Sequence, residues 1–221
     1  QKKITGRGYW SSKDFFTAKY QEQKDRHAKF NDTSYNLEPN IKENPGCLRD
    51  IQSIGWVAKQ HFNVWNGREL VEHGYFTERE WAELIECRSH LWRMRFGLHL
   101  VSGRSENRLL FDYQADVAEI LGYGEGKEAV ETMMKAFFRV VRRVSELNSM
   151  LLQYFTQDIL DLNVKHTCVI DENFELLDGL IAARKDKVFD SPESILRFLR
   201  LIADTAECKG LHSSALRQLR N

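Results

Sequence analysis

The chain has 221 residues, of which 42% are apolar and 29% charged, and its 32 basic and 32 acidic side chains cancel to zero formal charge. This composition excludes a disordered chain, and the charge balance disfavours nucleic acid or an anionic membrane as a partner. No apolar run approaches the ~18 residues of a membrane helix, and no signal peptide is recognisable, so we expect a cytoplasmic protein. The chain begins with Gln1 rather than methionine and ends abruptly, and we expect a fragment of a longer protein.

Helical periodicity dominates the first two thirds of the chain. Ser11 or Ser12 can cap the first expected helix, and Thr77 with Glu80 forms a capping box for a long one. The expected helices span residues 14–30, 48–62, 68–73, 78–101, 114–122 and 128–155. Their short connections predict an all-α antiparallel bundle.

The pattern changes after residue 162. Apolar runs on both sides of residues 171–173 predict a small β-hairpin near 168–177. Ser191 and Pro192 are typical of a helix start, and a last helix should cover residues 213–220. We therefore expect three parts: a connecting helix in 1–35, a helical domain in 36–163, and a hairpin with helices in 164–221.

Motifs for catalysis or metal binding are missing from the sequence. The four cysteines, Cys47, Cys87, Cys168 and Cys208, form no C-x-x-C pair, and we expect reduced thiols. The seven histidines do not cluster, and no P-loop, G-x-S-x-G or G-x-G-x-x-G motif is present. We expect no catalytic residue and no metal site in this chain.

The most unusual stretch is "NLEPNIKENPGCLRDIQ", which holds two prolines directly before a periodic helix. Pro45 and Gly46 suit the central positions of a type II turn, which would leave the first N–H groups of that helix free to bind an anion. Lys42, Arg49 and Asp50 could then border a phosphate. The simpler alternative is that Asp50 complements the helix dipole while the two basic side chains are solvated.

Two arginines interrupt an apolar stripe. Arg88 and Arg95 fall on the same face of the 78–101 helix as its tryptophan and leucine residues. A buried guanidinium needs an anion, so we expect each to pair with a core carboxylate such as Asp50 or Asp112, or to reach the rim. A ligand phosphate is the other possibility.

A basic face on the longest helix suggests a second class of function. Arg139, Arg142 and Arg143 lie close together, and Glu146 follows Arg142 by one helical turn. Internal pairing favours a solvated face over a nucleic-acid strip. The alternative function is a stand-alone protein- or RNA-interaction module.

Three segments carry a family resemblance: "YNLEPNIKENPGCLRDIQSIGWVAKQHF", "LWRMRFGLHLVSGRSENRLLFDYQADVAEILGY" and "RVVRRVSELNSMLLQYF". Together they resemble the bifunctional uridylyltransferase/uridylyl-removing enzymes of bacterial nitrogen regulation. The family motif E-P-[DN]-[IV]-K followed by G-G-L-R-D falls on residues 38–42 and 46–50. Cys47 stands where the family usually has its second glycine.

The resemblance implies a place within a larger enzyme. Such an enzyme would transfer UMP from UTP to the PII signal protein, remove it again, and respond to glutamine. Its nucleotidyltransferase domain, with magnesium, would precede this chain, and an HD hydrolase domain would follow. The fragment itself would be inactive, with Lys42, Gly46, Arg49 and Asp50 bordering the transferase cleft.

Overall fold

The computed structural model describes residues 10–63, 67–160 and 167–220, with the side chain of Arg220 set aside. It divides into two compact units, residues 1–152 and 153–221, and the division falls inside the longest helix. The expected boundary between residues 163 and 164 lies outside the described residues. We describe each unit by itself.

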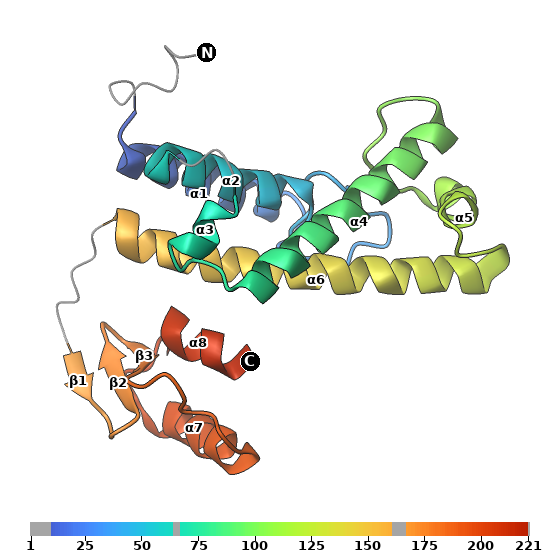
Figure 1. Cartoon of the computed structure of the whole chain (residues 1–221). Coiled ribbons are helices and arrows are strands. Elements are labelled where there is room, and N and C mark those ends of the chain that lie inside the picture. The colour runs from blue at the N-terminus through green and yellow to red at the C-terminus, as the bar shows by residue number, and fades with distance from the viewer. Residues whose placement is uncertain (1–9, 64–66, 161–166, 221) are drawn as a thin grey trace. The chain divides into compact units, whose positions relative to one another are not determined.

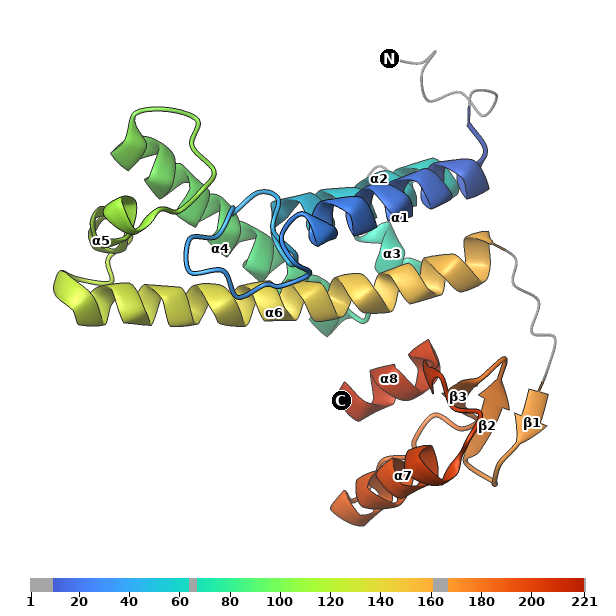
Figure 2. The same cartoon turned by 180° about the vertical axis from the view of Figure 1, so that it is seen from behind.

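Unit 1 is a helical bundle. Its helices are α1 (Ser12–Ala28), α2 (Leu48–Phe62), α3 (Glu69–Glu72), α4 (Glu78–Ser102), α5 (Phe111–Ile120) and α6 (Gly126–Ile159), the last extending into unit 2. α1 and α2 lie side by side along α6, and α4 crosses it (Figure 1). Seen from behind, the segment that joins α1 to α2 lies across α6 (Figure 2). The predicted mainly α-helical class is confirmed.

The helix starts follow local capping chemistry. The Ser11 hydroxyl accepts the N–H of Asp14, and the capping box of Thr77 and Glu80 is present as predicted. The bounds of α2 coincide with the prediction. α5 begins three residues earlier than predicted because the carboxylate of Glu38 accepts the N–H of Phe111, at 3.0 Å. The sequence of α5 itself cannot predict this cap, because Glu38 lies far from the helix in the chain.

The core of unit 1 lies between α4, α5 and α6. Every side chain of its centre is fully or almost fully buried, among them Leu91, Met94, Leu98, Val117, Met133, Phe137, Val141 and Val144. α6 supplies half of these. Within the described residues, no helix is both long and apolar enough to cross a membrane.

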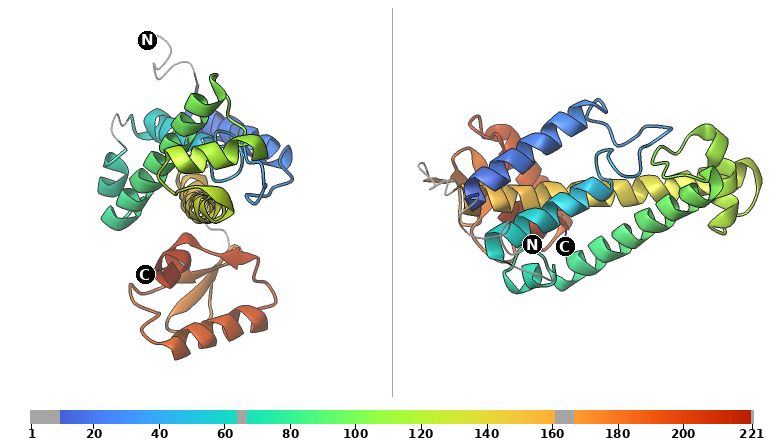
Figure 3. Two further views of the ribbon diagram at one scale, coloured as in Figure 1. Left: turned by 90° about the vertical axis from the view of Figure 1, so that its right-hand side faces the viewer. Right: turned by 90° about the horizontal axis from the view of Figure 1, so that it is seen from above.

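Unit 2 holds a small sheet of four strands beside two helices (Figure 3). The strands are β1 (Thr167–Val169), β2 (Phe174–Leu177), β3 (Leu180–Ala183) and β4 (Gly210–Leu211), and the helices are α7 (Pro192–Asp204) and α8 (Ser213–Arg220). The β1–β2 and β2–β3 pairs are antiparallel, and β3–β4 is parallel. Phe174, Ile181 and Phe198 form the centre of its core.

The predicted hairpin is confirmed, but the sheet is larger than expected. β2 and β3 are joined by Asp178 and Gly179, whose φ angles are 50° and 93°. An Asp-Gly pair between apolar runs is the usual signal for such a two-residue turn, so the sequence could have predicted β3. β4 has two residues and is too short for any periodicity.

The ion pair between Glu83 of α4 and Arg143 of α6 should make the stability of unit 1 depend on pH. Burial raises the pKa of its carboxyl, but the hydrogen bonds and charges of Arg143 and Arg79 outweigh this and hold the pKa below the ordinary value of 4.5. Because the pKa is lower in the folded than in the unfolded state, the ionised carboxyl stabilises the fold at any pH above its ordinary pKa. This stabilisation is lost as the pH falls through the lowered, folded-state pKa. Glu83→Gln should therefore lower the free energy of unfolding by about 1 kcal/mol at about pH 7, and by almost nothing at about pH 2.

Urea unfolding at the two pH values measures this difference. Glu86→Gln makes the same change on α4 at an exposed side chain without an ion pair in the described residues, and it should have little effect at either pH. Equal losses for Glu83→Gln at both pH values would contradict the electrostatic account.

Candidate functional site

The turn predicted at residues 44–47 is present and packs tightly. The N–H of Cys47 donates to the carbonyl oxygen of Asn44 at 3.0 Å, and Gly46 has φ +77°, as a type II turn requires. A Cβ atom at Gly46 would lie 2.2 Å from the backbone oxygen of Val141 on α6. Position 46 therefore requires glycine for two reasons: its positive φ angle and the close approach of the turn to α6.

The predicted backbone anion site at the start of α2 is wrong. The N–H of Leu48 donates to the oxygen of Ile41 at 3.3 Å, and that of Arg49 donates to the oxygen of Lys42 at 2.8 Å. The Asp50 N–H donates to the oxygen of Cys47 at 3.0 Å. The preceding segment folds back over the helix start, so these donors are not free for a ligand.

The anion at this place is the side chain of Asp50, which is fully buried. One carboxylate oxygen accepts the N–H of Gly46 at 2.7 Å, and the other accepts Nη2 of Arg26 at 2.8 Å. Nε2 of His27 lies 3.0 and 3.1 Å from the two oxygens. Arg26 also donates to the backbone oxygen of Glu43 at 3.0 Å. These contacts join α1, the turn and α2, and we call Asp50 with its partners the Asp50 cluster.

Lys42 and Arg49 lie at the surface beside this cluster. Both are half-buried, and each has a side-chain nitrogen 3.7 Å from a carboxylate oxygen of Glu43. The guanidinium of Arg49 also lies over the ring of Trp56, 5.5 Å from its centroid. The charged partner of Asp50 is Arg26, and Arg49 pairs with Glu43 instead.

Cys47, the last residue of the turn, points into the core. Its side chain is fully buried, and burial together with the charge of Asp50 raises the pKa of its thiol well above the ordinary value. The thiol is therefore protonated and turned away from the surface on which Lys42 and Arg49 lie.

The buried ion pairs expected for Arg88, Arg95 and Asp112 are wrong, and the alternative, in which the two arginines reach the rim, agrees with the structure. Arg88 and Asp112 are exposed. Arg95 is half-buried, donates to the side chain of Asn107 at 2.8 Å, and lies over the ring of Trp92. Long arginine side chains leave an apolar stripe by bending toward water, so a position on the stripe does not fix the position of the charge.

The basic face on α6 is partly neutralised. Nε of Arg142 donates to Glu146 at 3.1 Å, while Arg143 binds Glu83 and also donates to Glu146 at 3.2 Å. Arg139 is exposed. This pairing removes the main observation in favour of an RNA-binding module.

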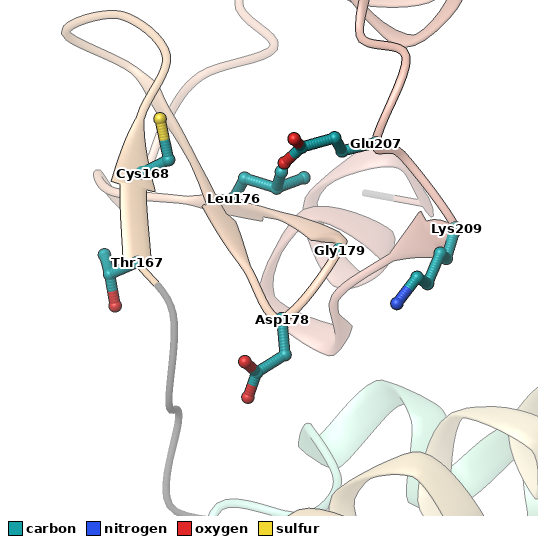
Figure 4. Close-up of a pocket in the computed structure, with 7 residues that line it drawn as sticks. All are labelled: Thr167, Cys168, Leu176, Asp178, Gly179, Glu207 and Lys209. Atoms are coloured by element: carbon teal, nitrogen blue, oxygen red, sulfur yellow. The ribbon is translucent and has the colours of Figure 1, made fainter.

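A pocket in unit 2 is lined by Cys168, Asp178, Glu207 and Lys209 among others. The thiol of Cys168 and the carboxylate of Asp178 point in opposite directions, so the side chains do not converge on one reacting point (Figure 4). Across the residues that the structure describes, no three His, Cys, Asp or Glu side chains gather as metal ligands.

Fold and site together define a helical domain whose buried polar cluster supports a surface segment. The chain belongs to the GlnD PII-uridylyltransferase family, whose model matches residues 14–152. This match covers most of unit 1. No solved structure matches the chain significantly.

Curated relatives extend the match to almost the whole chain. A bifunctional uridylyltransferase/uridylyl-removing enzyme of Idiomarina loihiensis is 53% identical over 96% of this chain and 24% of its own length. The enzymes of that name from Photobacterium profundum and Vibrio campbellii are 48% and 47% identical over 100% of the chain and 26% of theirs. The chain thus spans about a quarter of the length of these relatives.

Gly46→Ala should destabilise unit 1 by at least about 2 kcal/mol, because the substitution adds both backbone strain and a clash with α6. Gly74→Ala is the matched control: Gly74 has φ +75° but open space around it, so only the strain of about 1 kcal/mol should appear. Denaturant midpoints of the two variants measure the difference. Equal losses would show that the close approach to Val141 contributes nothing.

Asp50→Asn should cost about 3–5 kcal/mol, because it leaves the guanidinium of Arg26 buried without its counter-charge. Arg26→Met should cost a similar amount for the reciprocal reason. If Asp50 and Arg26 stabilise the fold as a pair, the variant with both substitutions loses much less unfolding free energy than the two single variants lose together. Asp25→Asn, an exposed neighbour on α1, is the control. Additive losses in the double variant would contradict a coupled pair.

Proposed function

We propose that this chain is the central helical region of a longer enzyme that transfers UMP from UTP to the PII protein and removes it again in response to glutamine. Family membership over residues 14–152 and the name carried by the relatives support this assignment. Residues 1–35 would connect to a preceding nucleotidyltransferase domain, residues 36–163 would form the helical domain, and residues 164–221 would lead into an HD domain. The enzyme would work in the cytoplasm, where its nucleotide substrate is found.

The chemistry of transfer would lie outside these residues. Nucleotidyl transfer needs carboxylates that hold magnesium, because the reaction depends on positioning and on metal-bound charge. Within the described residues, no three His, Cys, Asp or Glu side chains gather as metal ligands. We assign this chain a supporting role, without a catalytic residue of its own, on the contacts described next.

The observation that carries the supporting role is the Asp50 cluster. It fixes residues 40–50 as a rigid segment and holds Lys42 and Arg49 at the surface, each 3.7 Å from Glu43. We propose that this segment forms one wall of the transferase cleft. The two basic side chains would then leave Glu43 for the phosphates of the nucleotide, as charge-assisted contacts favour.

Transfer of radiolabelled UMP from UTP to PII, with magnesium, tests both parts. The longer enzyme should transfer label and the 221-residue chain should not. Arg49→Ala in the longer enzyme should lower kcat/KM for UTP by about tenfold or more, since a charged contact to phosphate is lost. Its thermal unfolding should change little, because Arg49 is not part of the Asp50 cluster.

Arg93→Ala is the matched control, because Arg93 is exposed on α4 and has no ion pair within the described residues. Transfer of label by the 221-residue chain alone would overturn the supporting role. Normal kcat/KM for the Arg49 variant would return Lys42 and Arg49 to a structural role. Absence of transfer by the longer enzyme would overturn the proposed activity itself.

A further inference from the structure

A pocket of about 750 Å³ opens between the segment that follows α1 and the loop before α5. Backbone hydrogen bonds hold these two walls together: the Ile41 N–H donates to Asn107 at 2.8 Å, and the Leu109 N–H donates to Pro39 at 2.9 Å. The side-chain amide of Gln114 also donates to the oxygen of Leu37 at 2.8 Å. The pocket is therefore built on a fixed frame within unit 1.

Amide groups dominate its polar lining, which includes Asn31, Asn36, Asn40 and Asn44. The side-chain oxygen of Asn40 accepts the N–H groups of Lys42 and Glu43, at 3.1 and 2.9 Å. That of Asn44 accepts the N–H of Asn40 at 3.1 Å. Both amides are thus oriented by the backbone, so that only their NH₂ groups remain as hydrogen-bond donors.

These NH₂ groups have no partner in the described part of the chain. The amide nitrogen of Asn44 is buried and makes no hydrogen bond, and that of Asn40 makes none within the described residues either. The Asn44 nitrogen lies beneath the pocket surface, whereas the Asn40 nitrogen is not among the buried atoms and is open to the pocket. A ligand with a carbonyl oxygen would therefore give the NH₂ group of Asn40 the acceptor that the described residues do not supply.

Two aromatic side chains flank the same pocket. Tyr35 and Phe111 are 60% and 59% exposed, unusually open for rings of this size. The Tyr35 ring contacts Phe138, with centroids 5.6 Å apart, and its exposed part faces solvent. Exposed rings beside hydrogen-bond donors suit a planar, polar ring such as a nucleobase.

Positive charge completes the lining. Lys29 is exposed and forms no ion pair within the residues that the structure describes, while Arg108 pairs loosely with Glu38 at 3.4 Å. The two cations outnumber the single carboxylate. The pocket therefore offers an aromatic and amide-lined part for a base, and charges for the phosphates attached to it.

We propose that this pocket binds the uracil ring of a uridine nucleotide, with the amide NH₂ group of Asn40 donating a hydrogen bond to a carbonyl oxygen of the ring. Tyr35 and Phe111 stack on the ring, and Lys29 and Arg108 face the phosphate next to the ribose, which leaves Lys42 and Arg49 for the outer phosphates of UTP. Cytosine and adenine carry an amino donor at the edge where uracil carries a carbonyl, and a donor facing a donor is rejected. The proposal rests on the proposed function for its uridine nucleotide and adds the residues that select the base.

Asn40→Asp in the longer enzyme is the sharpest test. A carboxylate still accepts the N–H groups of Lys42 and Glu43, so the segment keeps its conformation, while the pocket loses a donor and gains an acceptor. Calorimetric titration with UMP and CMP, in EDTA and without PII, should show UMP binding weakened about tenfold. The preference for UMP over CMP should fall by at least that factor. Asn63→Asp makes the same change at an exposed position outside the pocket and should leave both affinities unchanged.

Tyr35→Ala separates stacking from base reading. Stacking tolerates any base, so this variant should weaken UMP and CMP equally and keep their ratio. Phe96→Ala, an equally exposed ring on α4 outside the pocket, is its control. An unchanged UMP affinity and an unchanged UMP-to-CMP ratio in Asn40→Asp would overturn the proposal, provided that thermal unfolding matches that of the unsubstituted enzyme.

The uridine nucleotide has two sources, free UTP and the uridylyl group on modified PII, and kinetics of Asn40→Asp distinguish them. A raised KM for UTP in transfer assigns the pocket to the free nucleotide. A raised KM for uridylylated PII in removal assigns it to the protein-bound group. Because UMP binding is measured without PII, a failure of transfer to PII would overturn the proposed function and leave the binding result standing.

Discussion

A single buried carboxylate determines how the first half of this molecule is arranged. Asp50 is fully buried and its charge must be matched, because an isolated ion inside a protein costs several kcal/mol. Arg26 supplies the counter-charge from α1, and the Gly46 N–H supplies a hydrogen bond from the turn. Each partner comes from a different element. The pair therefore specifies one mutual position of α1, the turn and α2 where apolar contacts alone would permit several.

Because of this arrangement, the groups proposed to bind a ligand here are side chains rather than the N–H groups at the N-terminus of α2. With the first N–H groups of α2 bonded to Ile41, Lys42 and Cys47, the segment before the helix becomes a rigid cover rather than an open anion site. The outer face of this stretch carries the amide of Asn40 and the half-buried side chains of Lys42 and Arg49. Asp50, Asn40, Lys42 and Arg49 all belong to residues 40–50. A substitution that displaces the buried carboxylate is therefore expected to displace the surface groups as well.

Sequence motifs of neighbouring residues predicted the helices and turns well, but they predicted contacts between distant residues poorly. The type II turn, the capping box of Thr77 and the bounds of α2 depend on neighbouring residues, and all were predicted. The partner of Asp50 was not, because Arg26 lies on another helix and no spacing rule relates the two. The buried ion pairs predicted for Arg88 and Arg95 were wrong for a related reason. Helical periodicity gives the direction of the Cα–Cβ bond, whereas the charge of a long side chain can lie far from that direction. The sequence carried no signal for the amide-lined pocket, since its walls are joined by contacts between residues far apart in the chain, such as the bridge between Asn40 and Arg108.

The orientation of an amide side chain explains why backbone contacts matter for base selection. A free asparagine can present either its oxygen or its nitrogen, so it matches uracil and cytosine equally well after a flip. Anchoring the oxygen of Asn40 on two backbone N–H groups removes that choice and leaves a fixed donor. The anchor itself depends on residues 42 and 43 staying in place, and these are held by the hydrogen bonds to Arg49 and Arg26. Selectivity at the surface pocket is thus a consequence of the buried ion pair beneath it.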